Sequence, residues 1–235
     1  MPRSTLPRRQ AERLGAPGRR RADFRVLGGP ALAMLQIADV PRGLRALDGL
    51  VKEAPVEVLA AGTVQSGHYL IAFLGQVEAA TRSFARASEL SGESTVDSVL
   101  LPDAEERIVP AFRDDVVRAP VRASGDALGV IQTAACPVLL SAIDAALKGA
   151  RVDLVELRVA EGLAGKALAT LWGDLADVEA AIELACAVVT RQLEKRAGAL
   201  GAANVGATLG AATYSIIPRM PSISGFIRYD SPRLM

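Results

Sequence analysis

The side chains that carry most enzyme chemistry are scarce in this chain of 235 residues. His68 is its only histidine, so any Ser-His-Asp or Cys-His arrangement depends on that residue, and one chain cannot bind a metal through several histidines. Carboxylate pairs such as Glu105 with Glu106 and Asp174 with Asp177 lie in polar stretches, where solvated surface is their usual place. Neither GxGxxG nor GxxxxGK(S/T) occurs, so no phosphate-binding loop is indicated. We therefore expect no catalytic residues and no metal site.

Charge is distributed unevenly along the chain. Residues 1–25 contain eight arginines against Glu12 and Asp23, a net charge of +6, so residues 26–235 of this +1 chain carry −5. The arginine-rich segment has few apolar residues, which predicts a mobile arm that either is solvated or touches an acidic partner. Aromatic residues make up 4% of the chain, too few to interleave with basic residues in a nucleic-acid interface.

Cysteine usage and hydropathy both favour the cytoplasm. Cys136 and Cys186 lack CxxC spacing, and residues 1–25 lack the apolar core of a secretory signal, so both thiols are expected to be reduced core residues. Residues 197–218 contain no charge, but they are mainly Gly, Ala, Thr, Asn and Ser. A membrane span needs about 20 strongly apolar residues, so we expect a surface insertion, flexible or packed, and no membrane association.

The longest pattern is an internal repeat with an offset of 96 residues. Positions 31–56 and 127–152 are identical at 11 of 26 places. Each copy is longer than a solenoid repeat, whose period is roughly 20–50 residues, so each is large enough to have its own core. The chain is therefore expected to be a tandem pair.

Both copies predict the same order of elements: strand, helix, hairpin, helix, strand. Apolar runs predict the strands, and a 3.6-residue period predicts the helices. Asp39 and Pro41 mark the start of the first helix, with the proline near its first position. The expected strands are 31–37, 56–64, 69–74 and 95–101, then 127–133, 152–160, 166–172 and 212–217. The expected second helices are 76–90 and a longer one from near 174, and the first helix of the second copy is 137–149. This order predicts the α+β class, an antiparallel sheet flanked by helices.

Several phrases resemble the bacterial microcompartment shell domain. They are ALGVIQT at 127–133, IDAALKGA at 143–150 and GKALATLWGDLADVEAA at 165–181, with weaker versions at 46–54, 66–67 and 75–80. The resemblance implies two tandem copies of this ferredoxin-like-related domain. The boundaries are then a basic tail at 1–26, shell domains at 27–118 and 124–225, a linker at 119–123 and a C-terminal tail at 226–235.

Two such domains in one chain resemble the tandem-domain shell proteins. That resemblance implies a non-enzymatic structural component of a microcompartment shell in the cytoplasm, a homotrimer that mimics the hexamers of single-domain relatives and has a central pore for metabolites. Its implied partners are hexameric and pentameric shell tiles and encapsulated enzymes, without nucleic acid or membrane. An alternative from another class is a tandem ferredoxin-like regulatory module that binds a small metabolite.

The resemblance also implies residues at the tile edge. A lysine late in the first helix lies at that edge in the family, which corresponds to Lys52 and Lys148, and Arg219 corresponds to an edge arginine after the last strand. The first copy has Asp103 at the arginine position, so alternate edges are expected to differ. Without the resemblance, the two lysines are exposed helix residues with an aspartate four residues earlier, a pair that contributes about 0.2 to 0.5 kcal/mol.

The hairpin turns correspond to the pore loops of the family. The expected pore-lining residues are Gln65, Ser66, Gly67, His68, Glu161, Gly162, Leu163, Ala164, Gly165 and Lys166. Rings of their charges would bias which metabolites pass, and His68 would change charge near its unperturbed pKa of about 6.5. As plain tight turns they need no such role. Some tandem relatives hold an iron–sulfur cluster through a cysteine on the axis, but neither turn contains cysteine, so no cluster or other cofactor is expected.

Overall fold

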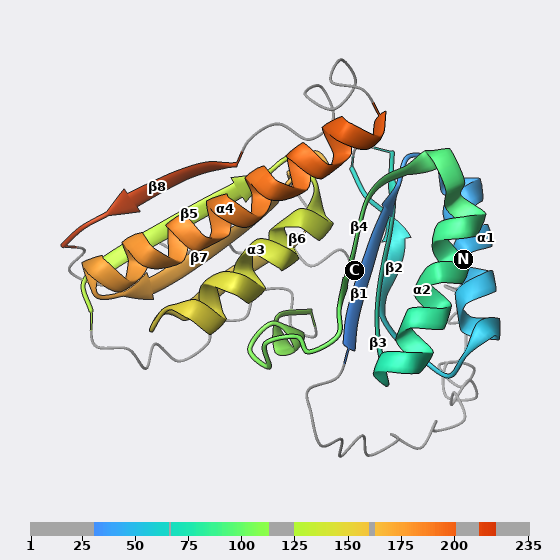
Figure 1. Ribbon diagram of the computed structural model, residues 1–235, viewed down its shortest axis with the longest axis horizontal. Helices are drawn as coiled ribbons and strands as arrows, with labels where there is room; N and C mark the ends of the chain where they lie inside the picture. The colour runs from blue at the N-terminus through green and yellow to red at the C-terminus, as the bar shows by residue number, and fades with distance from the viewer. Residues whose placement is uncertain (1–30, 66, 113–124, 160–162, 201–211, 220–235) are drawn as a thin grey trace, which may run out of the picture.

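The computed structural model describes residues 31–65, 67–112, 125–159, 163–200 and 212–219 (Figure 1). The first unit contains β1 (Ala31–Ile37), α1 (Val40–Glu53), β2 (Glu57–Thr63), β3 (Tyr69–Gly75), α2 (Val77–Ser91) and β4 (Thr95–Leu101). The second contains β5 (Ala127–Thr133), α3 (Cys136–Gly149), β6 (Asp153–Val159), β7 (Ala167–Gly173), α4 (Leu175–Leu200) and β8 (Thr213–Ile217). Short 3-10 helices lie at η1 (Gly92–Ser94) and η2 (Val109–Phe112). The order of elements is the same in both units, as the repeat predicts.

Each unit is built on a four-stranded antiparallel sheet. The strand orders are β2-β3-β1-β4 and β6-β7-β5-β8. The central pairs are in register from Ala31 opposite Gly75 to Ile37 opposite Tyr69, and likewise along β5 and β7. The predicted α+β class is confirmed.

Strands β1 and β3 are buried along their whole length because both faces of the first sheet are covered. Successive side chains of a strand point to opposite faces, so a strand covered twice is apolar throughout. One face packs against α1 and α2 through Ala31, Ala33, Leu35, Ile37, Ile71 and Phe73. The other face belongs to the core of the second unit through Leu32, Met34, Leu70, Ala72, Leu74 and Val99.

Helix α3 lies between the two sheets and joins the units (Figure 1). It contacts β1 and β4 of the first unit as well as α4 and its own sheet. Ten of its 14 residues are buried, against three in α1, Gly43, Ala46 and Leu50. A helix covered on several sides must be apolar almost all round, whereas a surface helix needs only one apolar stripe. The two units therefore share a continuous core.

The second copy has the longer second helix, as predicted. Helix α4 has 26 residues against 15 in α2, and residues 197–200 of the uncharged stretch form its end, whereas residues 201–211 of the predicted insertion lie outside the described residues. Alanine is a strong helix former, which explains the continuation. Within the described part of the chain, no helix is long and apolar enough to cross a membrane. The predicted tails at 1–26 and 226–235 and the linker at 119–123 lie outside the described residues.

Candidate functional site

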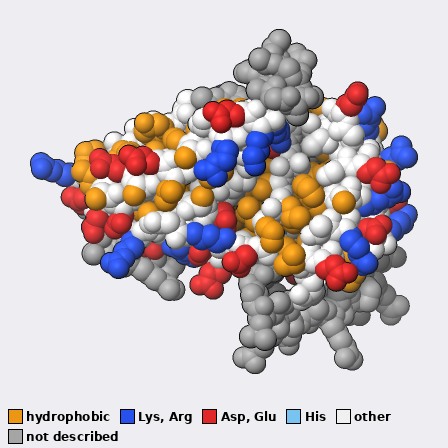
Figure 2. Space-filling model, in the orientation of Figure 1, with side chains coloured by type: hydrophobic (Ala, Val, Ile, Leu, Met, Phe, Trp, Pro, Cys, Tyr) orange, Lys and Arg blue, Asp and Glu red, His pale blue; other side chains and the backbone are white. Residues whose placement is uncertain are grey.

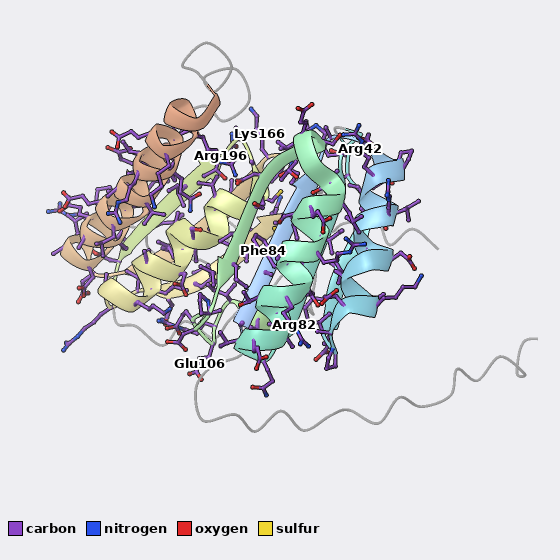
Figure 3. All side chains as sticks on the ribbon, turned by 45° about the vertical axis from the view of Figure 1, so that its right-hand side comes forward. Arg42, Arg82, Phe84, Glu106, Lys166 and Arg196 are labelled. Atoms are coloured by element: carbon purple, nitrogen blue, oxygen red, sulfur yellow. The ribbon has the colours of Figure 1, made fainter. Side chains whose placement is uncertain are left out.

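The hairpin turns of the two units are direct neighbours. The backbone N–H of Ala164 donates a hydrogen bond to Oε1 of Gln65 at 3.4 Å. Figure 3 shows Lys166 at the same end of the molecule as Arg42 and Arg196, and Glu106 at the opposite end. Of the residues expected to line a pore, the structure describes Gln65, Gly67, His68, Leu163, Ala164, Gly165 and Lys166, whereas Ser66, Glu161 and Gly162 lie outside the described residues.

Glycine closes both turns. Gly67 has a φ of 77° and Gly165 a φ of 82°, a left-handed conformation that only glycine adopts without strain. The Gly67 N–H donates to the carbonyl of Val64 at 2.9 Å, and the Lys166 N–H donates to that of Leu163 at 3.0 Å. Backbone bonds therefore hold the turns, and the exposed side chain of Lys166 is not needed to close its turn.

A buried amide connects the two turns. Nε2 of Gln36, on β1, lies 3.0 Å from Nδ1 of His68 and donates to the carbonyl of Gly165 at 3.2 Å. Its Oε1 accepts the backbone N–H of Cys136 at 2.9 Å. Gln36 is 1% exposed, so its bonds replace those with water. The sequence analysis missed this residue, although glutamine at 132, the same place in the second copy, was a signal for it.

The amide also determines the state of His68. Because Oε1 of Gln36 accepts from Cys136, Nε2 is the donor and Nδ1 of the imidazole is the acceptor, so the ring is neutral with its hydrogen on Nε2. Burial lowers the pKa of His68 from its ordinary value. The expected change of charge near neutral pH therefore moves to lower pH.

A buried carboxylate forms a second connection between the units. Asp97, on β4, is fully buried, and its Oδ2 accepts the backbone N–H of Val138, in the first turn of α3, at 2.8 Å. Its Oδ1 accepts the N–H of Ser98 at 2.6 Å and a bond from the guanidinium of Arg196, which also donates to the Val96 carbonyl at 2.7 Å. Burial raises the pKa of Asp97 to about 6, opposed by Arg196 and the two backbone donors. The sequence analysis did not single out Asp97 or Arg196.

The chain after β4 folds over the C-terminal end of α3. The guanidinium of Arg107 donates to the carbonyls of Leu147 at 2.9 Å and Val152 at 2.7 Å. The N–H of Glu105 donates to Oδ1 of Asp144 at 2.8 Å. A cation at a helix C-terminus satisfies carbonyls that have no partner within the helix. The connection between the units is thus held at both ends of α3.

Both cysteines are reduced thiols that lie in or beside the core. Cys136 is fully buried, as predicted, and its Sγ lies 3.6 Å from the Gly165 carbonyl. Cys186 is only half-buried at the margin of the core, and burial raises the pKa of its thiol. Among the described residues, no group of three or more His, Cys, Asp or Glu side chains is placed to hold a metal ion.

The two lysines predicted at tile edges have different surroundings. Nζ of Lys52 lies 2.7 Å from Oδ2 of Asp48, and both side chains are largely exposed. Nζ of Lys148 lies 3.0 Å from Oδ2 of Asp144 and also donates to the backbone carbonyl of Asp103. Lys148 is therefore tied to the connection between the units, whereas the ion-pair partner of Lys52, Asp48, is on its own helix. Arg219 follows β8 as predicted and is exposed.

Comparison with known protein families identifies both units. The BMC domain matches residues 31–104 and 127–205, one match in each unit. The chain belongs to the BMC domain family. The bacterial microcompartment shell protein PduT of Citrobacter freundii is 30% identical to this BMC protein over 155 residues, which cover 66% of this chain and 82% of PduT.

Solved structures extend the similarity to the whole fold. A microcompartments protein from Desulfitobacterium hafniense is 27% identical with a TM-score of 0.63, covering 81% of this BMC protein and 95% of its own chain. A fused permuted hexameric shell protein from the RMM microcompartment has a TM-score of 0.53 over 68% of this chain and 84% of its own, and at 19% identity it supports the fold alone.

This BMC protein is a structural component of a bacterial microcompartment shell, as the resemblance implies. The alternative of a metabolite-binding regulatory module finds no support among these relatives. Figure 2 shows acidic and basic side chains interspersed over one face of the described residues, with hydrophobic side chains gathered near its middle.

Proposed function

We propose that this BMC protein is a cyclic homotrimer whose six domains form a tile of hexagonal outline with a central pore for metabolites. The tile has no catalytic role and joins hexameric and pentameric shell proteins around encapsulated enzymes. Its two shell domains are residues 27–118 and 124–225. Because each chain contains two BMC domains, a trimer has six domains.

The observation that carries the proposal is a contrast between aligned residues of α1 and α3. Leu44 is 52% exposed and Val51 is 47% exposed, whereas Leu140 and Leu147, ninety-six residues later, are 0% and 3% exposed. Leu140 and Leu147 are buried where α3 lies between the two sheets. Exposed leucine and valine at the matching places of α1 indicate that α1 makes the same contact with a second copy of the chain.

The second sheet offers the matching surface. Its outer face carries a hydrophobic cluster that contains only strand residues within the described part of the chain: Leu128, Val155 and Trp172, with Val130 and Ile217 packed against them. In the first sheet the same face is covered by α3. If α1 of a neighbouring chain packs on this face, it repeats between chains the contact that α3 makes with the first sheet within one chain. Such head-to-tail contacts are heterologous, and they close into a ring when the rotation between neighbours allows it.

The hairpin turns then surround the symmetry axis. Within one chain the turns already contact each other through Ala164 and Gln65, and threefold repetition brings six turns together. Lys166 is exposed in its turn, and three copies make a ring of positive charge that favours anionic metabolites. The imidazole of His68 is neutral because its Nδ1 accepts from Gln36 and because burial lowers its pKa. Three copies of His68 therefore make the pore polar without adding charge near pH 7.

Lys52, Lys148 and Arg219 lie at the edges of the proposed tile. An exposed lysine packs its aliphatic stem against a neighbour while its ammonium reaches polar atoms beyond it. Lys52 is suited to that contact because its partner Asp48 is on the same helix and is itself exposed. Lys148, which also bonds the Asp103 carbonyl, makes the alternate edges different.

Negative-stain electron microscopy, with sedimentation equilibrium for the mass in solution, tests the proposal. We expect three chains per particle and flat particles with a sixfold outline. Monomers, or compact dimers without that outline, would overturn it.

A further inference from the structure

The first helix of each unit has one carboxylate at its N-terminus, but the two carboxylates come from different places. In α1, Oδ1 of Asp39, the residue before the helix, accepts the N–H of Arg42 at 2.9 Å. In α3, the residue before the helix is Ala135, which makes no side-chain cap. There the N–H of Val138 donates to Asp97 of the other unit at 2.8 Å.

The alignment of the two copies shows an exchange. Ala135 is aligned with Asp39, and Val138 with Arg42, at the offset of 96. On the sheets, Asp97 lies opposite Gln36, whereas Thr213 lies opposite Gln132, the residue aligned with Gln36. The first copy therefore has a carboxylate on both its helix start and its sheet, and the second copy has neither.

The guanidinium that accompanies Asp97 also comes from the second copy. Arg196 lies in the part of α4 that has no counterpart in α2, which ends at Ser91. The carboxylate of Asp97 on the first sheet therefore has all its donors only beside a second unit, which supplies both the Val138 N–H and the Arg196 guanidinium.

We infer that the positions of Asp39 and Asp97 select the partner surface in assembly, so that α1 is accepted by the second sheet of another copy of this chain and rejected by a first sheet. The inference rests on the proposed trimer. Pairing α1 with a first sheet directs two carboxylates, Asp39 and Asp97, at the single N–H of Arg42. Pairing α3 with a second sheet leaves the N–H of Val138 without a carboxylate. Only alternation of the two copies gives each helix start one carboxylate.

The physical cost of wrong pairing is substantial because the site is buried. Asp97 is 0% exposed and is compensated by three donors. A second carboxylate at the start of α1 would have to share with Asp39 both the Arg42 N–H and the Arg42 guanidinium, whose Nε lies 3.9 Å from Oδ2 of Asp39 and whose Nη1 already donates to Ser94. Like charges placed together across an interface disfavour the wrong partner. The same selection excludes shell subunits that carry an acidic residue at the place of Thr213.

The test places two carboxylates at the start of α1, at its proposed contact with the second sheet of another chain. In full-length protein near pH 8, Thr213→Asp places a second carboxylate beside Asp39 of the neighbouring chain, and Thr213→Asn is the uncharged control of similar size. Adding Asp39→Ala to Thr213→Asp recreates the arrangement of α3, with the carboxylate supplied by the sheet. Sedimentation velocity over a dilution series measures the dissociation of trimer.

We expect Thr213→Asp to weaken association at least tenfold, Thr213→Asn to leave it within about threefold of wild type, and the double variant to recover most of the loss. Circular dichroism checks that each chain is folded. Equal affinities for Thr213→Asp and Thr213→Asn, or a double variant weaker than Thr213→Asp, would overturn the inference while the wild type remains a trimer. A wild type that is not a trimer would instead overturn the proposed function.

Discussion

Gln36 and His68 are thirty-two residues apart in the sequence, and Nε2 of the amide lies 3.0 Å from Nδ1 of the imidazole. The bond requires an unprotonated Nδ1, and burial acts in the same direction by lowering the pKa of the ring. The protonation of one turn residue is thereby coupled to the contact between the two units.

That coupling predicts a pH dependence of stability. In the unfolded chain His68 has its ordinary pKa of about 6.5, so as pH falls through that value the unfolded state takes up a proton before the folded state does. The stabilisation is complete above about pH 6.5 and is lost below it. We expect wild type to lose stability relative to His68→Gln, which keeps an acceptor for Gln36, between about pH 7.5 and about pH 5.5. Urea unfolding at both pH values measures the difference, and a difference that does not change with pH contradicts the prediction.

Removal of the Gln36 amide is expected to destabilise the chain. Gln36→Leu leaves the Cys136 N–H and the Gly165 carbonyl without this partner, and each buried unsatisfied group costs about 1 to 3 kcal/mol. Gln132→Leu, at the aligned and only half-buried place, is the matched control and is expected to cost less in unfolding free energy. Equal losses for the two variants in chemical denaturation would show that the bridge is not specific to Gln36.

Asp97 predicts the opposite pH dependence. Its pKa is raised to about 6 by burial, above an ordinary value of 3.8, so the folded state takes up the proton first. Stability from this group therefore rises as pH falls from about 6 to about 4, by about 3 kcal/mol at most. Unfolding of wild type and Asp97→Asn across that range isolates the effect. The assignment is contradicted if the difference in unfolding free energy between wild type and Asp97→Asn stays constant, or if wild type becomes relatively less stable on acidification.

The aligned leucines provide a matched pair. Leu140→Ser removes a fully buried side chain and is expected to cost about 3 to 4 kcal/mol of unfolding free energy. Leu44→Ser changes a side chain that is 52% exposed, so it is expected to cost less than about 1 kcal/mol within the chain but to shift trimer toward monomer. Denaturation and sedimentation together separate the two effects. A Leu44→Ser protein that remains fully trimeric on dilution would remove α1 from the interface.

The edge lysines also differ in a measurable way. Lys52→Ala removes an exposed pair with Asp48, so chain stability is expected to stay within about 0.5 kcal/mol of wild type, while the assembly of tiles into sheets weakens. Lys148→Ala additionally removes the bond to the Asp103 carbonyl and is expected to lower stability more. Electron microscopy of the sheets and thermal unfolding measure the two properties. Normal sheets from Lys52→Ala would mean that this lysine is not at the tile edge.

Much of the fold was predictable because local patterns determine it. The run Ala31–Ile37 is long enough for a strand and is apolar at six of its seven positions, and Asp39 with Pro41 identifies where α1 begins. The start of α3 was less clear because Ala135 provides no cap, and its predicted start at 137 is one residue late.

The polar connections could not be predicted from local patterns. Gln36 accepts a hydrogen bond from Cys136, 100 residues later, and Asp97 accepts one from Arg196, 99 residues later. At such separations along the chain, a single sequence contains no signal that two residues are in contact. Their residue types are also misleading, since glutamine and aspartate are usually on the surface. Arg196 lies in a helical extension that the repeat does not contain, so comparison of the two copies could not reveal it.

The unequal surroundings of Lys52 and Lys148 have a consequence for a sheet of tiles. A hexagonal outline fits its vacancy in six rotations, but the proposed trimer, with its alternating edges, is unchanged by only three of them. If the two lysines lie at the edges as proposed, each tile has two distinct orientations. In one, Lys52 faces Lys52 of the neighbouring tile, and in the other it faces Lys148, which is also bonded to the Asp103 carbonyl. A perfectly ordered sheet requires its tiles to choose between them, and a frozen mixture of the two would blur threefold detail into false sixfold symmetry.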